Sequence, residues 1–524
     1  MSAALQTRDR RRCAGILMPV FSLPSEHGIG CFDKEAREFI TMLAVAGQSR
    51  WQILPLGPVG EGNSPYQPRS CFAGDPIYID PVRLLEKNLI TPREVVEMKG
   101  IMKASPEASG SRSLRAVNYH AVRNGREYIF QKAFDRFVPD QDYADFEQEN
   151  RFWLEDYALF ESMSTVFGTS SWDRWPDELR FRDPDALKRW TSKHWKLIDM
   201  NKWLQFEFFQ EWNAILRFAH QRGINIIGDL PIYASYESAD CWAHPELFQL
   251  DSDLKRADVS GAPPDGFNPE GQVWGNPLYD WKYHRNTDFS WWISRIRHNL
   301  SMFDTLRLDH TRGFCAYYSV PAGEATGLHG HWEAGPGLEF FRAVEKALGP
   351  CDLIAEDLGF ITDDVVEMVR AAGLPGMKVL QFAFDGDPDN PYLPENIRED
   401  SVVYTGTHDN DTSVGWFSSL DQGTREKITL YLREREGIRM SAAGRAPVFS
   451  SQSAAISLMQ NALMTRAYMC IIPMGDYLLL GSQGRINTPG TVKGNWEWRM
   501  EKDAFTPELA ASIRSSCRRC GRNN

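Results

Sequence analysis

Three short runs rich in apolar residues, each followed by an acidic residue, constrain the fold of this chain more than any other feature. The runs cover residues 303–308, 353–355 and 402–407, and Asp309, Glu356 and Asp409 come after them at similar intervals. Such runs are typical of strands that are buried on both faces of a parallel sheet. Carboxylates that follow parallel strands lie at the carboxyl edge of the sheet, where α/β barrels carry their functional residues.

Eight such runs alternate with helical patterns, as in repeated strand–helix–strand units. We therefore predict an α/β fold, a (β/α)8 TIM barrel, in which the carboxyl ends of the strands converge on one site. Apolar side chains recur every three to four residues in 202–223, which predicts a crossover helix, and 335–348 is expected to form another. The predicted strands are 15–19, 50–56, 224–232, 305–309, 353–357, 379–384, 402–407 and 468–473.

Two gaps between these strands are much longer than a strand–helix–strand unit of roughly 30 residues requires. We predict one catalytic barrel over 1–524 with insertion subdomains at roughly 61–200, after the second strand, and 234–290, after the third. The first insertion is expected to be helical, and the second, rich in Pro, Gly and Asp, to be dominated by loops. Too few residues follow the eighth strand for a β-sandwich, which needs roughly 100.

The composition of the chain limits which binding partners and which cellular compartment are expected. The formal net charge of −12 favours neither nucleic acid nor an anionic membrane. No stretch reaches the roughly 18 apolar residues of a membrane span, and two prolines interrupt 15–24, which makes it a poor signal peptide. Nine irregularly spaced cysteines indicate free thiols and a cytoplasmic location, and neither they nor the histidines show metal-ligand spacing.

The acidic residues suit glycosidic bond chemistry with retention, in which one carboxylate attacks and a second protonates the leaving oxygen. Arg307, two residues before Asp309 on the same strand face, favours an ionised Asp309. The apolar run before Glu356 favours a raised pKa, as an acid needs. Asp409, next to His408, could bind sugar hydroxyls and stabilise the transition state. The alternative is a barrel ion pair at Arg307–Asp309 and a solvated strand end at Glu356–Asp357.

Longer motifs make the chain resemble the 4-α-glucanotransferases, also called amylomaltases, which form glycoside hydrolase family 77 of the α-amylase superfamily. The resemblance covers nearly the whole chain. Its matching segments are 15–17, 28–30, 51–58, 64–67, 228–232, 238–240, 263–265, 271–277, 355–359, 376–382, 406–412 and 487–490.

The resemblance implies Asp309 as nucleophile, Glu356 as acid/base and Asp409 as transition-state stabiliser, with no metal or organic cofactor. It also implies sugar contacts from Tyr66, Asp229, Trp274, Phe267, Arg307, Phe382, His408 and Asn487. Departures from the family pattern lie away from the three acids. Gly266 stands where a lid tyrosine is common, and Glu61 where another tyrosine is common.

The expected activity is transfer of α-1,4-glucan segments by double displacement. Maltooligosaccharides, amylose or other α-1,4-glucans would be donors, and glucose or another glucan the acceptor. The two insertions at strand carboxyl ends and the short C-terminus favour transfer. A retaining α-1,4-glucan hydrolase and a catalytically dead glucan-binding protein remain the alternatives.

Overall fold

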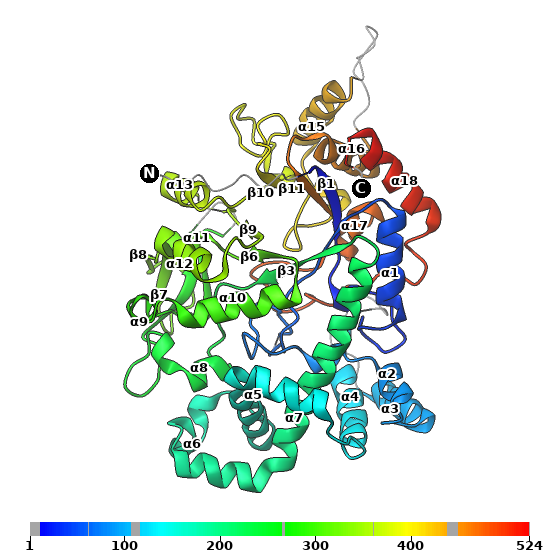
Figure 1. Cartoon of the computed structure of the whole chain (residues 1–524). Coiled ribbons are helices and arrows are strands. Elements are labelled where there is room, and N and C mark those ends of the chain that lie inside the picture. Colours follow the sequence, from blue (N-terminus) through cyan, green and yellow to red (C-terminus); the bar gives the residue numbers. More distant parts are fainter. Residues whose placement is uncertain are drawn as a thin grey trace.

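Eight parallel strands close into a barrel in the computed structural model, which describes residues 11–60, 62–105, 116–264, 268–359, 361–437 and 449–522 (Figure 1). The predicted TIM barrel is therefore confirmed. Neighbours around the barrel follow the order β1-β12-β11-β10-β9-β6-β3-β2. The strands are β1 Cys13–Leu17, β2 Arg50–Gln52, β3 Asn225–Leu230, β6 Thr305–Leu308, β9 Leu353–Ala355, β10 Gly376–Val379, β11 Ser401–Tyr404 and β12 Met469–Pro473.

The barrel strands are almost wholly buried because side chains on one face fill the barrel and those on the other pack against helices. Inside the barrel, the Tyr404 hydroxyl donates to Gln52 Oε1 at 2.9 Å. Trp51 is fully buried, and its Nε1 donates to the carbonyl oxygen of Met18 at 2.8 Å. Each buried polar atom in these pairs is thereby satisfied, as a low-dielectric interior requires.

The sixth barrel strand lies earlier in the sequence than predicted. The sequence pattern pointed to 379–384, whereas β10 ends at Val379 and the apolar residues that follow form the 3-10 turn η5, Leu380–Phe382. Apolar content alone does not separate a buried strand from a buried turn, because both place their side chains in the core.

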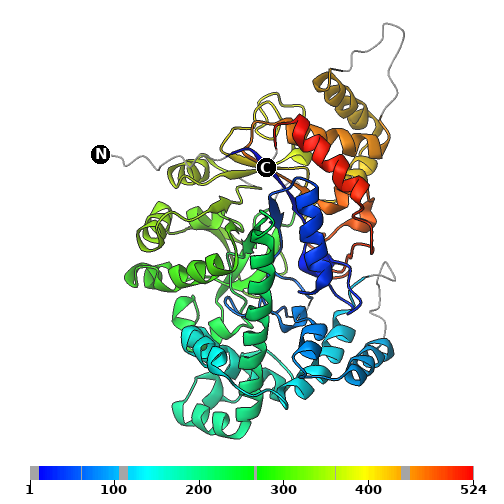
Figure 2. The same ribbon diagram turned by 45° about the vertical axis from the view of Figure 1, so that its right-hand side comes forward.

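The predicted crossover helices are present. The stretch 202–223 forms the second half of α7, Pro184–His220, which bends at His194 and runs beside α1, Lys34–Val45 (Figure 2). The stretch 335–348 forms α12, Leu338–Leu348. The barrel helices also include α10 Ser290–Met302, α13 Asp363–Ala371, α16 Ser451–Met464 and α18 Pro507–Arg519.

The first insertion is helical, as expected, and gathers on one side of the barrel (Figure 1). Its longest element, α5, packs along α7, so the crossover helix of the barrel also forms the core of the insertion. The insertion comprises α2 Pro81–Glu86, α3 Pro92–Ala104, α4 Tyr119–Phe134, α5 Gln141–Phe167, α6 Asp177–Arg180 and the first half of α7.

The second insertion contains strands that the sequence analysis did not predict. A four-stranded antiparallel sheet has the order β5-β4-β7-β8, in which β4 Asp258–Ala262 and β5 Gln272–Pro277 come from the insertion. Its other strands, β7 Ala316–Pro321 and β8 His331–Ala334, follow β6 of the barrel. Most of the segment is loop, as expected, but its strands were not predicted because β4 pairs with β7, which lies beyond the next barrel strand in sequence.

None of the helices in the described ranges is long and apolar enough to cross a membrane. All nine cysteines carry free thiols. Both observations concern the described part of the chain alone.

A buried arginine closes the barrel where β1 meets β12. The Arg522 guanidinium is fully buried and donates to carbonyl oxygens of Leu463 at 2.7 Å, Cys13 at 3.0 Å and Thr465 at 3.0 Å. Cys13 begins β1, and Thr465 precedes β12, so one side chain joins both strands of the closing pair.

Replacement of this arginine should therefore loosen the barrel seam. We expect Arg522→Met to lower the free energy of unfolding by more than about 2 kcal/mol, because several buried carbonyls lose a charged donor. Urea denaturation measures the change. Arg519→Met is the matched control, since among the described residues the Arg519 side chain bonds Ser515 and Ser516 of its own helix alone. Equal stability of the two variants would contradict the proposed clamp.

Candidate active site

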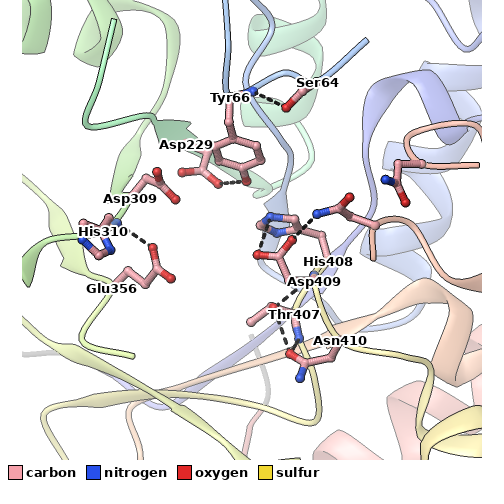
Figure 3. A network of polar contacts seen from close by, with 12 residues as sticks. Ser64, Tyr66, Asp229, Asp309, His310, Glu356, Thr407, His408, Asp409 and Asn410 are labelled. Carbon is pink, nitrogen blue, oxygen red and sulfur yellow. Dashed lines mark hydrogen bonds and ion pairs between the residues drawn. The ribbon is translucent and has the colours of Figure 1, made fainter. Parts of the chain in front are cut away.

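The three predicted acids lie at the carboxyl ends of three barrel strands (Figure 3). Asp309 directly follows β6, Glu356 directly follows β9, and Asp409 lies in the turn after β11. Since β6 and β9 are neighbours in the barrel, Asp309 and Glu356 lie side by side, whereas Asp409 faces them from the other side of the site.

Arg307 organises the floor of this site. Its side chain is 1% exposed and points from β6 to the same face as Asp309, two residues on. Nη1 contacts Asp229 Oδ2 at 2.6 Å and Asp309 Oδ1 at 3.3 Å, while Nη2 contacts Glu356 Oε2 at 2.9 Å. One guanidinium therefore binds three carboxylates from three adjacent strands.

Tyr66 covers the site from the loop after β2. Its hydroxyl donates to Asp229 Oδ2 at 2.7 Å, and its ring lies parallel to that of His408, with centroids 5.1 Å apart. Asp229, at the end of β3, is thus held by Arg307 on one side and Tyr66 on the other. The flat stack of Tyr66 on His408 offers an apolar ring face of the kind that packs against sugars.

Asp409 is oriented from a loop much later in the sequence. Asn487 Nδ2 donates to Asp409 Oδ1 at 2.6 Å, and His408 Nε2 lies 3.3 Å from Oδ2. The Asn487 backbone N–H also donates to the carbonyl oxygen of His408 at 3.1 Å. The Asp409 side chain is 41% exposed, so it reaches into the open part of the site while its carboxylate remains fixed.

The pKa values of Asp309 and Glu356 are shifted in opposite directions in this site. Burial and the neighbouring Glu356 raise the pKa of Asp309 well above its ordinary value, against the opposing effect of Arg307. Burial acts to raise the pKa of Glu356 as well, but Arg307 and the backbone N–H of His310 lower it below its ordinary value. These directions are the reverse of those that the sequence suggests, and the two carboxyls interact strongly, so they titrate as a pair.

The reversal has a geometric cause. Arg307 is closer to Glu356, at 2.9 Å, than to Asp309, at 3.3 Å, and it shares the nitrogen that faces Asp309 with Asp229. Glu356 also accepts the His310 backbone N–H at 2.6 Å. Glu356 and Asp357 do not form a solvated strand end. Glu356 is bound by Arg307, and Asp357 is paired with Lys378 at 3.0 Å.

Trp274, one of the predicted sugar contacts, borders this cluster, and Phe382, another, follows the barrel strand next to β9. Trp274 lies on β5, and its ring meets that of His310 edge to face, with centroids 4.9 Å apart. Phe382 ends η5, directly after β10. Phe267, the predicted lid residue, lies outside the described residues.

Several further residues join the site without having been predicted to do so. The backbone N–H of His310, a residue with φ of 44°, bonds Glu356, and a backbone donor leaves no mark in the sequence. Arg485 Nη2 donates to the carbonyl oxygen of Asp409 at 2.8 Å. Trp496 lies 5.8 Å from Tyr66, centroid to centroid. Nothing in the sequence pattern marked Arg485 or Trp496 as part of the site, because both lie far along the chain from the residues that they contact.

Within the described ranges, no group of three or more histidine, cysteine or acidic side chains is arranged to hold a metal ion. The polar side chains of the site bond one another, and the chemistry they offer is that of a carboxylate pair with a third carboxylate facing it.

Known proteins resemble this chain over nearly its whole length. A family model described as 4-alpha-glucanotransferase matches residues 18–505. The 4-alpha-glucanotransferase of Clostridium butyricum is 39% identical over 511 residues, which cover 96% of this chain and 100% of the relative. That of Aquifex aeolicus is 42% identical over 494 residues, which cover 94% of this chain and 96% of the relative.

A solved structure agrees with these relatives. The amylomaltase from Streptococcus agalactiae in complex with acarbose matches with a TM-score of 0.89 at 33% identity, over 98% of this chain and 100% of the other. The match covers the barrel, whose strand ends carry the acidic cluster described above, and it also covers both insertions. This chain belongs to the 4-alpha-glucanotransferase family, glycoside hydrolase family 77.

Proposed function

We propose that this chain transfers α-1,4-glucan segments between maltooligosaccharides, or to glucose, by a retaining double displacement at Asp309 and Glu356. The single observation that carries the mechanism is the shared contact of both carboxylates with Arg307, which keeps them side by side on adjacent strands. Retaining enzymes need their two carboxyl groups close together, at roughly 5–5.5 Å, because one attacks the anomeric carbon directly.

In the first half of the reaction, Asp309 attacks the anomeric carbon of the donor. The bond between that carbon and the leaving 4-oxygen breaks, and Glu356 gives its proton to this oxygen. A covalent glycosyl ester on Asp309 results. Positive charge develops on the sugar ring in the transition state, and the exposed Asp409 carboxylate, fixed by Asn487, is placed to stabilise it.

In the second half, Glu356 takes the proton from the 4-hydroxyl of an incoming sugar. The freed oxygen attacks the anomeric carbon, the ester bond breaks, and Asp309 leaves as a carboxylate. Two inversions restore the α-linkage. Water in place of the sugar hydroxyl would give hydrolysis, so the acceptor decides the outcome.

The first step needs an ionised Asp309 and a protonated Glu356. In the free site burial raises the pKa of Asp309, whereas Arg307 lowers that of Glu356 against the effect of burial. The two carboxyls interact strongly, so the pair titrates as a unit and a bound donor can shift the proton between them. A developing contact between Glu356 and the leaving oxygen favours the productive form.

Sugar binding is assigned to the groups around these acids. Tyr66, His408 and Trp274 supply ring faces, while Asp229, Arg307 and Asn487 are polar groups in the same cluster. We assign further sugar contacts to Phe382, which follows the strand next to β9, and to Phe267 by family resemblance alone. The nine free thiols support a reducing compartment, and we infer a cytoplasmic enzyme.

Chemical rescue distinguishes the two carboxylate roles. With α-maltotriosyl fluoride, whose leaving group needs little acid assistance, Glu356→Ala should still form the ester, and azide should release it as the α-glycosyl azide. Asp309→Ala cannot form the ester, so azide should displace fluoride directly and give the β-glycosyl azide. NMR of the products reads the anomeric configuration. The same anomer from both variants would contradict the assignment.

Product sizes distinguish transfer from hydrolysis. The wild-type chain with maltotriose should give glucose together with oligosaccharides longer than maltotriose, and Asp309→Asn should abolish both. Chromatography of the products checks this outcome. Maltose and glucose alone would indicate a hydrolase, and binding without turnover would indicate a glucan-binding protein.

The pH profile tests the electrostatic role of Asp229. Beside burial and Glu356, its negative charge raises the pKa of Asp309, so Asp229→Asn should lower the pKa values of the carboxyl pair. Both limbs of the bell-shaped plot of kcat/KM against pH should move to lower pH. Tyr66→Phe, which removes the hydrogen bond to Asp229 without changing charge, should leave the limbs in place. An unshifted profile in Asp229→Asn would refute this role.

A further inference from the structure

The loop between β10 and β11 is folded around one buried asparagine. Asn390 Nδ2 donates to the carbonyl oxygen of Phe382 at 2.9 Å, and its Oδ1 accepts the backbone N–H of Tyr392 at 2.7 Å. Asn396 Nδ2 in turn donates to the carbonyl oxygen of Asn390 at 2.9 Å. These bonds fix the backbone of Tyr392 relative to that of Phe382.

The ring of Tyr392 supports Phe382 from the side. The two rings meet edge to face, with centroids 5.6 Å apart and planes at 83°. Lys378 Nζ lies 5.5 Å from the centre of the Tyr392 ring and is itself held by Asp357 at 3.0 Å. Tyr392 is therefore held by packing on two sides, which limits its motion.

The hydroxyl of Tyr392 remains available to a ligand. It makes no hydrogen bond to any of the described residues, although the residue is only partly exposed. Burial, followed by the charges of Asp357 and Glu356, raises the pKa of Tyr392 to about 12. The hydroxyl thus keeps its proton at neutral pH and can donate to a sugar oxygen.

Tyr392 lies on the Glu356 side of the site, because its ring contacts Lys378, which pairs with Asp357, the residue directly after Glu356, and β10 neighbours β9 in the barrel. This position indicates which sugar the hydroxyl meets. An acid/base residue protonates the leaving sugar and deprotonates the incoming one, so the groups around Glu356 that do not surround Asp309 lie on the acceptor side. Tyr66 is on the other side, bonded to Asp229 and stacked on His408 beside Asp409.

We propose that Tyr392 is an acceptor-site residue, whose hydroxyl bonds the incoming glucose unit while its ring holds Phe382 against it. This inference rests on the proposed transfer reaction and adds a specificity-determining residue to it. Loss of the hydroxyl should weaken acceptor binding, and loss of the ring should also release Phe382. The formation of the ester on Asp309 does not involve this contact.

The test separates the two half-reactions. The donor is α-maltotriosyl fluoride methylated on its terminal 4-hydroxyl, which cannot itself act as an acceptor, and glucose is the added acceptor. For Tyr392→Phe we expect the apparent KM for glucose to rise about 2- to 10-fold, the effect of one lost hydrogen bond. Fluoride release without glucose should stay within about twofold of wild type, because the phenyl ring of the variant keeps the packing of residue 392 on Phe382.

Tyr431 offers a matched control. Its ring meets Phe384 edge to face at 5.6 Å and 76°, almost the geometry of Tyr392 on Phe382, and its hydroxyl bonds Glu395 at 2.5 Å. Tyr431→Phe should leave the KM for glucose unchanged. Tyr392→Ala should lower the ratio of transfer to hydrolysis further than Tyr392→Phe does.

Each outcome decides between the proposals. A KM for glucose in Tyr392→Phe equal to that of wild type overturns the acceptor role, and so does an equal loss of fluoride release and transfer. Absence of any transfer product from the wild-type chain overturns the proposed function, and this inference with it. Transfer by the wild type with an unaffected Tyr392→Phe variant overturns this inference alone.

Discussion

The active site depends on the burial of one guanidinium at the carboxyl end of β6. Arg307 is taken out of water, and a buried charge of this kind is tolerated only when it is paired and hydrogen-bonded. Its partners Asp229, Asp309 and Glu356 come from three adjacent strands, so their carboxylates converge even though like charges repel. The arginine thus links the barrel to the chemistry, because one side chain joins three strands and contacts both carboxyls of the proposed reaction.

Much of this architecture was predictable because its signals are local. Each barrel strand is a short apolar run. Asp309 and Glu356 follow such strands directly and Asp409 lies in the turn after another, so residue order alone placed all three at one edge. The sheet of β4, β5, β7 and β8 was not predicted, because its pairing crosses a barrel strand in the sequence. The pKa directions of the acid pair were not foreseen, since Arg307 lies nearer to Glu356 and shares its other nitrogen with Asp229 of another strand.

The insertions supply what a bare barrel lacks. The loop after β2 brings Tyr66 over the site, and β5 of the second insertion brings Trp274 to His310. Asn487 and Trp496 arrive from the segment after β12. Strand ends provide the reacting carboxylates, whereas the loops provide ring faces and hydrogen-bond donors around them, which allows substrate preference to vary while the reacting groups stay fixed.

The arginine clamp at the seam has a consequence for how the chain folds during synthesis. The first strand pairs on one side with β2, made soon after it, but its other neighbour is β12, which emerges only after all the other barrel strands and both insertions. Until then the growing sheet keeps open edges, which are prone to pairing with other chains. Arg522 comes later still, so a ribosome-bound chain passes most of its synthesis as an open sheet, when protection by chaperones would matter most.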